Sequence, residues 1–140
     1  MMYKMTRSIH DVLNQKNGLK VFMDETDSSS NAWLQFSGKD GVSYKIRFIS
    51  RDDDNDVAVR VYGLINVDEP RRIKMLPLLN DLNCKYRYVK FVLDSDGDVN
   101  LEYDYPIHSP NPAASAGEIA IRFAKIIDGV YPELMRALRG

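Results

Sequence analysis

The segment from Leu76 to Tyr105 constrains the fold of this chain more than any other. It reads LPLLNDLNCKYRYVKFVLDSDGDVNLEYDY, an apolar helix-forming run followed by two stretches in which apolar and polar residues alternate. An Asp-Gly pair between alternating stretches predicts a tight β-hairpin, because glycine adopts the positive φ that such turns need. One face of this hairpin is apolar and is formed by Val89, Phe91, Leu93, Val99, Leu101 and Tyr103. The segment therefore predicts a helix followed by an antiparallel strand pair.

The rest of the chain adds two helices and three strands. Helical spacing of apolar residues predicts a first helix from about Thr6 or Ser8 to Asn17 and a last helix from near Pro112. Residues 19–23 are compatible with a short extended segment, and a polar loop follows them. Alternating or continuous apolar runs predict strands at residues 31–37, 42–48 and 57–67. The order α-β-β-β-α-β-β-α predicts one α+β domain over residues 1–140, with helices packed on a five-stranded antiparallel sheet.

Two of the predicted helices contain residues that interrupt helical geometry. The second helix begins at Asp68 to Pro70 and contains Pro77, which removes a backbone donor and clashes one turn back. We therefore expect this helix to be kinked or to form two pieces. In the last helix, Gly129 and Pro132 predict a similar bend or break.

Charge and composition argue against several classes of protein. The 19 basic residues nearly balance the 20 acidic ones and are scattered, whereas nucleic-acid binders concentrate positive charge in a patch. The single cysteine cannot form an internal disulfide. The first residues lack the apolar region of a signal peptide, and no segment approaches the roughly 18 apolar residues of a membrane-spanning helix. We therefore expect a cytoplasmic protein with no nucleic-acid and no membrane partner.

No residue pattern indicates a catalytic, cofactor or metal site. Residues 94–98, DSDGD, invite a calcium interpretation, but the glycine is fourth rather than sixth and Tyr105 occupies the twelfth position, so a hairpin turn is favoured. The acidic run 52–56 could gather a cation, although most such runs are solvated loops.

Asn80 and Asn83 are expected to bond backbone groups near the end of the second helix. No ligand or triad spacing connects His10, His108 and Cys84, and we expect the cysteine to be buried.

Two surfaces are candidates for binding another polypeptide. The less apolar face of the sheet would carry aromatic and basic side chains of the kind enriched at interfaces, namely Trp33, Lys45, Arg47, Arg60, Tyr62, Tyr88 and Lys90. Alternatively, a helix covers part of this face and the cations extend past it to water. The second helix is apolar over more of its circumference than packing on one sheet requires. Its candidate dimer or partner residues are Ile73, Met75, Leu76, Leu78, Leu79 and Leu82.

The segment LLNDLNCKYRYVKFVLDSDGDVNLEYDY resembles the signature of YbjN-type bacterial domains, also called sensory transduction regulators. In that family a helix ending L-x-x-L-N leads into an F-x-L-D-x-D-G-x-V hairpin. The matching residues here are Leu79, Leu82, Asn83, Phe91, Leu93, Asp94, Asp96, Gly97 and Val99. A weaker resemblance covers most of the chain, whereas Pro77 departs from the family pattern. The resemblance implies a fold similar to that of type III secretion chaperones, which are small, cytoplasmic, dimer-forming proteins that bind extended polypeptide segments.

These observations lead to two functional hypotheses. The first is a non-catalytic protein-binding or regulatory module, a homodimer with chaperone-like architecture whose partner is a protein or peptide. The second is a small-ligand sensor with a pocket between the sheet and the helices. Neither hypothesis assigns a catalytic residue, a cofactor or a metal, and neither describes an enzyme.

Overall fold

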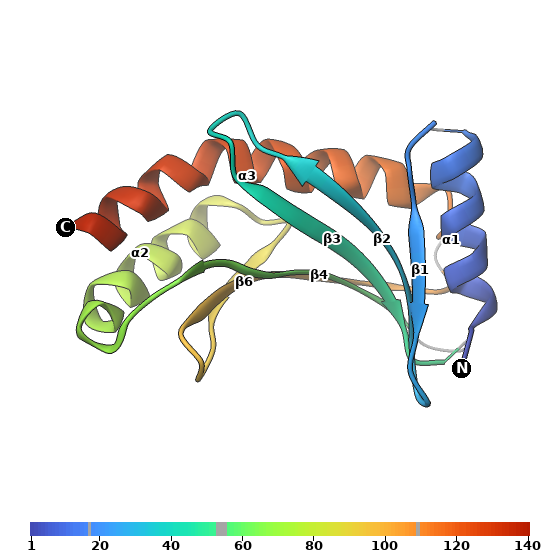
Figure 1. Cartoon of the computed structure of the whole chain (residues 1–140), viewed down its shortest axis with the longest axis horizontal. Coiled ribbons are helices and arrows are strands. Elements are labelled where there is room, and N and C mark those ends of the chain that lie inside the picture. The colour runs from blue at the N-terminus through green and yellow to red at the C-terminus, as the bar shows by residue number, and fades with distance from the viewer. Residues whose placement is uncertain (17, 53–55, 109) are drawn as a thin grey trace.

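The computed structural model describes residues 1–16, 18–52, 56–108 and 110–140. These residues form an α+β fold with three α-helices and a six-stranded antiparallel sheet. In chain order the elements are α1 (Lys4–Gln15), β1 (Phe22–Glu25), β2 (Ser30–Ser37), β3 (Ser43–Ser50), β4 (Asp56–Asn66), a 3-10 turn (Glu69–Arg71), α2 (Arg72–Lys85), β5 (Lys90–Leu93), β6 (Asp98–Pro106) and α3 (Ser115–Arg139) (Figure 1).

The sheet has the strand order β1-β2-β3-β4-β6-β5, so the prediction of five strands is wrong by one. The additional strand is β1, which pairs with the edge of β2 from Phe22 opposite Trp33 to Glu25 opposite Ser30. All four residues of β1 are exposed, so they show no apolar alternation. Strand β1 pairs with β2 through the backbone, and a strand of four exposed residues is too short for a side-chain pattern to reveal that pairing.

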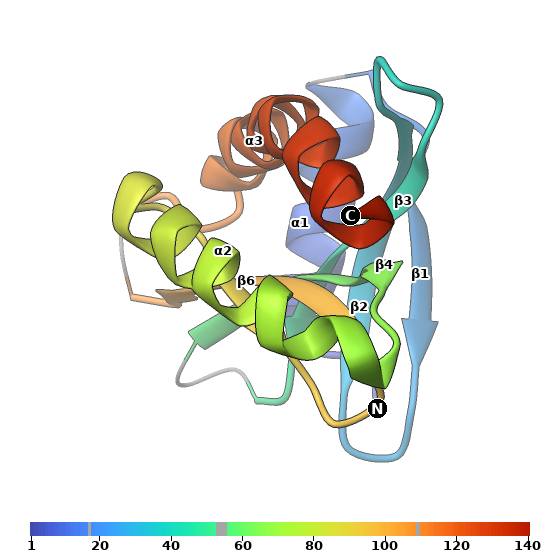
Figure 2. The same ribbon diagram turned by 90° about the vertical axis from the view of Figure 1, so that its left-hand side faces the viewer.

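The hydrophobic core lies between one face of the sheet and the helices. Figures 1 and 2 show α3 along one side of the sheet, with α1 toward the β1 end and α2 toward the other. The alternation predicted for residues 31–37 is confirmed, because Ala32 and Leu34 are buried in this core while Gln35 is exposed. The largest fully buried side chains include Phe48 on β3 and Phe123 on α3. The helices therefore cover one face of the sheet. The strand residues that alternate with the buried ones lie on the opposite face.

Neither α2 nor α3 is broken in the structure, so of the alternatives predicted for them the break is wrong, while the kink or bend stays a prediction. Helix α2 runs through Pro77, and α3 runs for 25 residues through Gly129 and Pro132. Pro77 is exposed, so water can serve the carbonyl that loses its backbone partner. In α3, Val130 and Leu134 are fully buried on either side of Pro132, and this packing holds the helix together. Among the described residues, no helix has the length and apolar character needed to cross a membrane.

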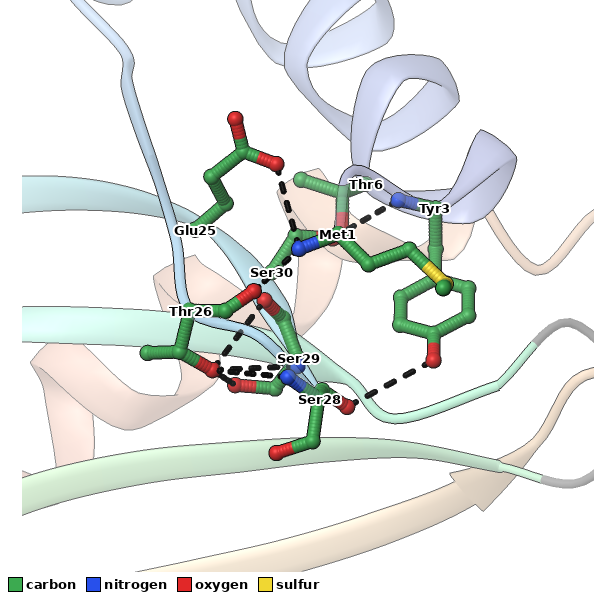
Figure 3. A network of polar contacts seen from close by, with 8 residues as sticks. All are labelled: Met1, Tyr3, Thr6, Glu25, Thr26, Ser28, Ser29 and Ser30. Atoms are coloured by element: carbon green, nitrogen blue, oxygen red, sulfur yellow. Dashed lines mark hydrogen bonds and ion pairs between the residues drawn. The ribbon is translucent and has the colours of Figure 1, made fainter.

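Helix α1 is attached to the β1–β2 hairpin by a polar network (Figure 3). The buried hydroxyl of Ser30 accepts a hydrogen bond from the backbone N–H of Tyr3 at 3.0 Å and lies 2.7 Å from the hydroxyl of Thr6. The amino group of Met1 forms an ion pair with Glu25 at 3.2 Å. The helix begins at Lys4, earlier than predicted, and this network fixes its first turn against the sheet.

Replacement of Ser30 with alanine is expected to lower the free energy of unfolding by about 1–3 kcal/mol, because the buried Thr6 hydroxyl loses its partner. Urea unfolding followed by circular dichroism measures this change. Ser28→Ala is the matched control, since only the backbone of exposed Ser28 takes part in the network. Equal stability of the two variants would show that the buried hydroxyl pair contributes nothing.

Candidate functional site

The side of the sheet opposite the core carries a row of aromatic and charged residues. At paired positions across all six strands the row reads Phe22, Trp33, Arg47, Arg60, Glu102 and Lys90. Gln35, Lys45 and Tyr62 lie beside it and are exposed. We call these nine residues the open sheet face. Cross-strand neighbours on one face are close enough for their side chains to interact.

Within the open sheet face, Trp33 is the centre of an aromatic–cation cluster. Its ring stacks on that of Phe22, with centroids 4.4 Å apart and planes at 21°. The Lys45 ammonium lies 4.4 Å from the Trp33 ring centroid, and the Arg47 guanidinium lies 5.4 Å from it. Arg47 also donates to Asn31 at 2.8 Å. Contacts of this kind combine dispersion with attraction between a cation and the ring quadrupole. Phe22, Trp33, Lys45 and Arg47 are named the Trp33 cluster.

The β4–β6 part of the open sheet face has its charges paired. Arg60 donates to Asp104 at 2.6 Å and lies 4.0 Å from Glu102, which also lies 3.7 Å from Lys90. Burial lowers the pKa of the Arg60 guanidinium, but the hydrogen bond and charge of Asp104 and the charge of Glu102 raise it above its ordinary value. This arrangement leaves little unbalanced charge for a partner on that side of the sheet.

A hollow of about 370 Å³ opens on this face where β3 and β4 separate. The two strands pair only over Arg47–Ser50 and Val57–Arg60, and β4 becomes irregular between Val61 and Ile65. Gly63 permits this irregularity with a φ of 61°. The residues that line the hollow are Gln35, Ser43, Tyr44, Lys45, Arg47 and Tyr62. The hollow thus adjoins the Trp33 cluster and offers polar and aromatic groups to a partner.

The structure brings together six of the seven predicted sheet-face residues and excludes one. The six that share the open sheet face as predicted are Trp33, Lys45, Arg47, Arg60, Tyr62 and Lys90. Tyr88 does not join them. Its ring stacks on Tyr103 at 4.5 Å, and Arg122 of α3 covers it at 4.7 Å. The reason is that β5 begins only at Lys90, so strand alternation does not determine the direction of Tyr88.

The proposed surface on α2 requires a larger correction. Met75, Leu79 and Leu82 are buried in the core, so they cannot contact a partner. Ile73 and Leu76 are 79% and 50% exposed, and Leu78 is half-buried. The helix packs on both β5 and α3, so two neighbours rather than one account for its wide apolar side.

A second cavity, of about 460 Å³, lies between the end of α2, β6 and α3. Its lining is aromatic and basic and comprises Lys85, Tyr86, Arg87, Tyr88, Tyr103 and Arg122. Burial, together with Tyr103, raises the pKa of Tyr88 to about 12. Arg122 is held by Glu118 at 2.7 Å. The i, i+4 spacing of Glu118 and Arg122 indicates an ion pair on the helix surface, but no sequence signal places that pair beside Tyr88.

Residues 94–98 form a hairpin turn, as predicted, and the carboxylate of Asp94 holds this turn together. Asp94 accepts hydrogen bonds from the backbone N–H groups of Asp96 and Asp98 at 2.9 and 3.0 Å and from the Asn100 amide at 2.9 Å. No group of three or more His, Cys, Asp or Glu side chains in the described part of the chain could hold a metal ion. Of the acidic run 52–56, residues 53–55 lie outside the described residues.

Asp94 is expected to titrate below an ordinary aspartate. The Asn100 hydrogen bond, the two backbone N–H groups and the charge of Arg72 favour its ionised form and lower its pKa. A lowered folded-state pKa contributes stability that is present above the ordinary pKa and is lost as the pH falls through the folded-state value. A carboxyl NMR titration tests this, with Asn100→Ala expected to raise the pKa. A wild-type value at or above the ordinary one would contradict the proposed role of these bonds.

Asn83 has a structural role, but its partner is the backbone of β5 rather than the end of its own helix as predicted. Its side-chain amide pairs with the backbone of Phe91, accepting from the N–H at 2.6 Å and donating to the carbonyl at 3.0 Å. It thereby occupies the free edge of β5 as a neighbouring strand would.

Cys84 is exposed, so the expectation that it is buried is wrong. Its position near the end of α2 places it away from the core-facing residues of that helix.

The residues described above lie in a segment of the chain that matches a known protein family. The family model YbjN, with the description "Putative bacterial sensory transduction regulator", matches residues 19–130. This range extends from before β1 into α3 and includes every residue of the open sheet face. No curated protein gives a significant match to the chain.

Proposed function

This chain belongs to the YbjN family, and we propose that it is a non-catalytic protein-binding or regulatory module that acts through the open sheet face. The main support is the Trp33 cluster, in which two aromatic rings and two cations lie on the side of the sheet opposite the core. Aromatic and arginine side chains are the types that contribute most to protein interfaces.

The experiment places a photoreactive residue on the open sheet face. p-Benzoylphenylalanine replaces Tyr62, which is 53% exposed beside the hollow. In native cell extract, illumination is expected to produce covalent adducts with a polypeptide that mass spectrometry identifies. The same replacement at exposed Lys125 of α3 is the control. Absence of adducts at position 62, or the same adducts from both positions, would overturn the proposal.

We also propose a chaperone-like homodimer in the cytoplasm, with α2 at the contact between the two copies. The residues available for this contact are exposed Ile73, Leu76 and Pro77, with half-buried Leu78 at its edge. Exposed apolar side chains on one helix lose contact with water when a second copy covers them. Light scattering at high micromolar concentration is expected to give twice the mass of the chain, and Ile73→Asp is expected to reduce it. A monomeric mass for the unmodified protein rejects the dimer.

The second candidate function is the sensing of a small ligand, and the cavity between α2, β6 and α3 favours it. Three cations line this cavity beside a pair of stacked tyrosines, so an anionic ligand would meet opposite charge there. A ligand that binds only the folded state raises the melting temperature. A thermal-shift screen of anionic metabolites tests this function. Retention of the shift in Arg122→Gln would exclude this cavity as the site.

A further inference from the structure

We infer that the Trp33 cluster binds an extended, acidic polypeptide segment whose carboxylates occupy alternate positions. This inference rests on the proposed function and names the partner class of the same surface. It is carried by the charge of the cluster, by an unpartnered indole N–H and by the spacing of two cations along β3.

The β1–β3 side of the open sheet face has an excess of positive charge. Lys45 is exposed and forms no ion pair with any described residue; its ammonium lies over the Trp33 ring. Arg47 lies 3.4 Å from Asp24, which is the acid facing this cluster, and Lys20 adds a further cation over Phe22 at 5.3 Å. On the β4–β6 side, by contrast, Glu102 and Asp104 pair with the cations. The complementary partner is therefore negatively charged and docks beside β3.

The indole nitrogen of Trp33 supplies an independent observation. Nε1 is buried and has no hydrogen-bond acceptor among the described residues. A buried donor without an acceptor destabilises a folded protein, so such groups are rare and call for an explanation. The Lys45 side chain is a flexible cover over this ring. A carboxylate that draws the ammonium away from the ring would bring an oxygen toward the indole N–H and satisfy it.

The spacing of the cations indicates an extended peptide. Lys45 and Arg47 are two residues apart on β3, and both project from the open sheet face. A strand rises about 3.3 Å per residue, so their attachment points are about 6.6 Å apart. Acidic residues at alternate positions of an extended peptide have the same separation. Two ion pairs can therefore form at once, while the hollow beside Tyr62 receives the residues that follow.

Trp33 is the only tryptophan of the chain, so its fluorescence reports directly on this cluster. The probe is a synthetic, end-blocked peptide of sequence Gly-Glu-Ser-Glu-Ser-Glu-Gly. Titration is expected to change the Trp33 emission saturably, and a rise from low salt to 0.5 M salt is expected to weaken binding, since the contacts are exposed charges. The matched peptide with glutamine at each glutamate position is expected to leave the emission unchanged.

Two charge reversals complete the test. Lys45→Glu is expected to weaken peptide binding about tenfold, since it removes one attraction and adds a repulsion. Lys125→Glu makes the same change in net charge on α3 and is expected to leave the affinity unchanged. Circular dichroism establishes that both variants fold. Because Trp33 fluorescence could respond to the substitution itself, calorimetric titration repeats the comparison.

Three results would overturn the inference: no response to the acidic peptide, an equal response to the glutamine peptide, or equal weakening by the two reversals. A response to protein concentration alone, without peptide, would assign the face to a second copy of the chain and overturn it too. Photocrosslinking from position 62 tests the proposed function independently, because it detects a polypeptide partner of any chemistry. Adducts at that position without binding of the acidic peptide would retain a polypeptide partner of different chemistry.

Discussion

Replacement of Gly97 with alanine is expected to lower the free energy of unfolding by more than about 3 kcal/mol. Gly97 has a φ of 85°, and an added Cβ would lie 2.4 Å from the backbone carbonyl oxygen of Val67. The positive φ alone costs roughly 1–2 kcal/mol for a residue with a side chain. The backbone must also shift, which weakens the 2.7 Å hydrogen bond from the Val67 N–H to the Gly97 carbonyl. Urea unfolding, followed by circular dichroism and Trp33 fluorescence, measures the loss.

Gly41 provides a matched control for this effect. Its φ is 83°, but nothing lies within 4 Å of the position that a Cβ would occupy. Gly41→Ala therefore isolates the conformational cost of about 1–2 kcal/mol. The difference between the two variants measures the close approach of the hairpin turn to the chain after β4. Equal losses would mean that the turn moves away from Val67 without cost.

Strand alternation carries most of the information that made this fold predictable. Residues 31–37 and the Asp-Gly hairpin follow the period of two, and the structure places both as predicted. The same rule placed Trp33, Arg47 and Arg60 together on one face. The rule fails at β1, because this strand has only four residues and no buried side chain, so it shows no period of two.

The errors in the candidate site have a common physical origin in tertiary contacts. A wide apolar side on α2 can mean a partner surface or two internal neighbours, and β5 and α3 account for its buried residues Met75, Leu79 and Leu82, whereas Ile73 and Leu76 remain exposed. The continuity of α3 through Pro132 likewise depends on the core residues around it. Tyr88 lies just outside β5, where no periodic rule applies. Residue propensities and apolar periodicity describe one helix or strand at a time. The burial of α2, the continuity of α3 and the direction of Tyr88 depend on which helices and strands pack together.

The two sides of α2 are expected to respond in opposite ways to the same substitution. Leu82→Asp is expected to cost at least about 5 kcal/mol, which would leave the chain largely unfolded. Leu82 is 2% exposed, so the variant loses a well-packed side chain and must bury a carboxylate without a partner. Loss of the cooperative urea transition measures this result.

Ile73→Asp changes the same helix at a position that is 79% exposed. Its carboxylate remains in water, so the free energy of unfolding should change by less than about 0.5 kcal/mol. This variant can therefore test the proposed contact between two copies, because a fall in mass cannot be attributed to unfolding. A folded Leu82→Asp variant would contradict the buried placement of that residue. That result would also make the buried apolar residues of α2 candidates for contact with a partner again.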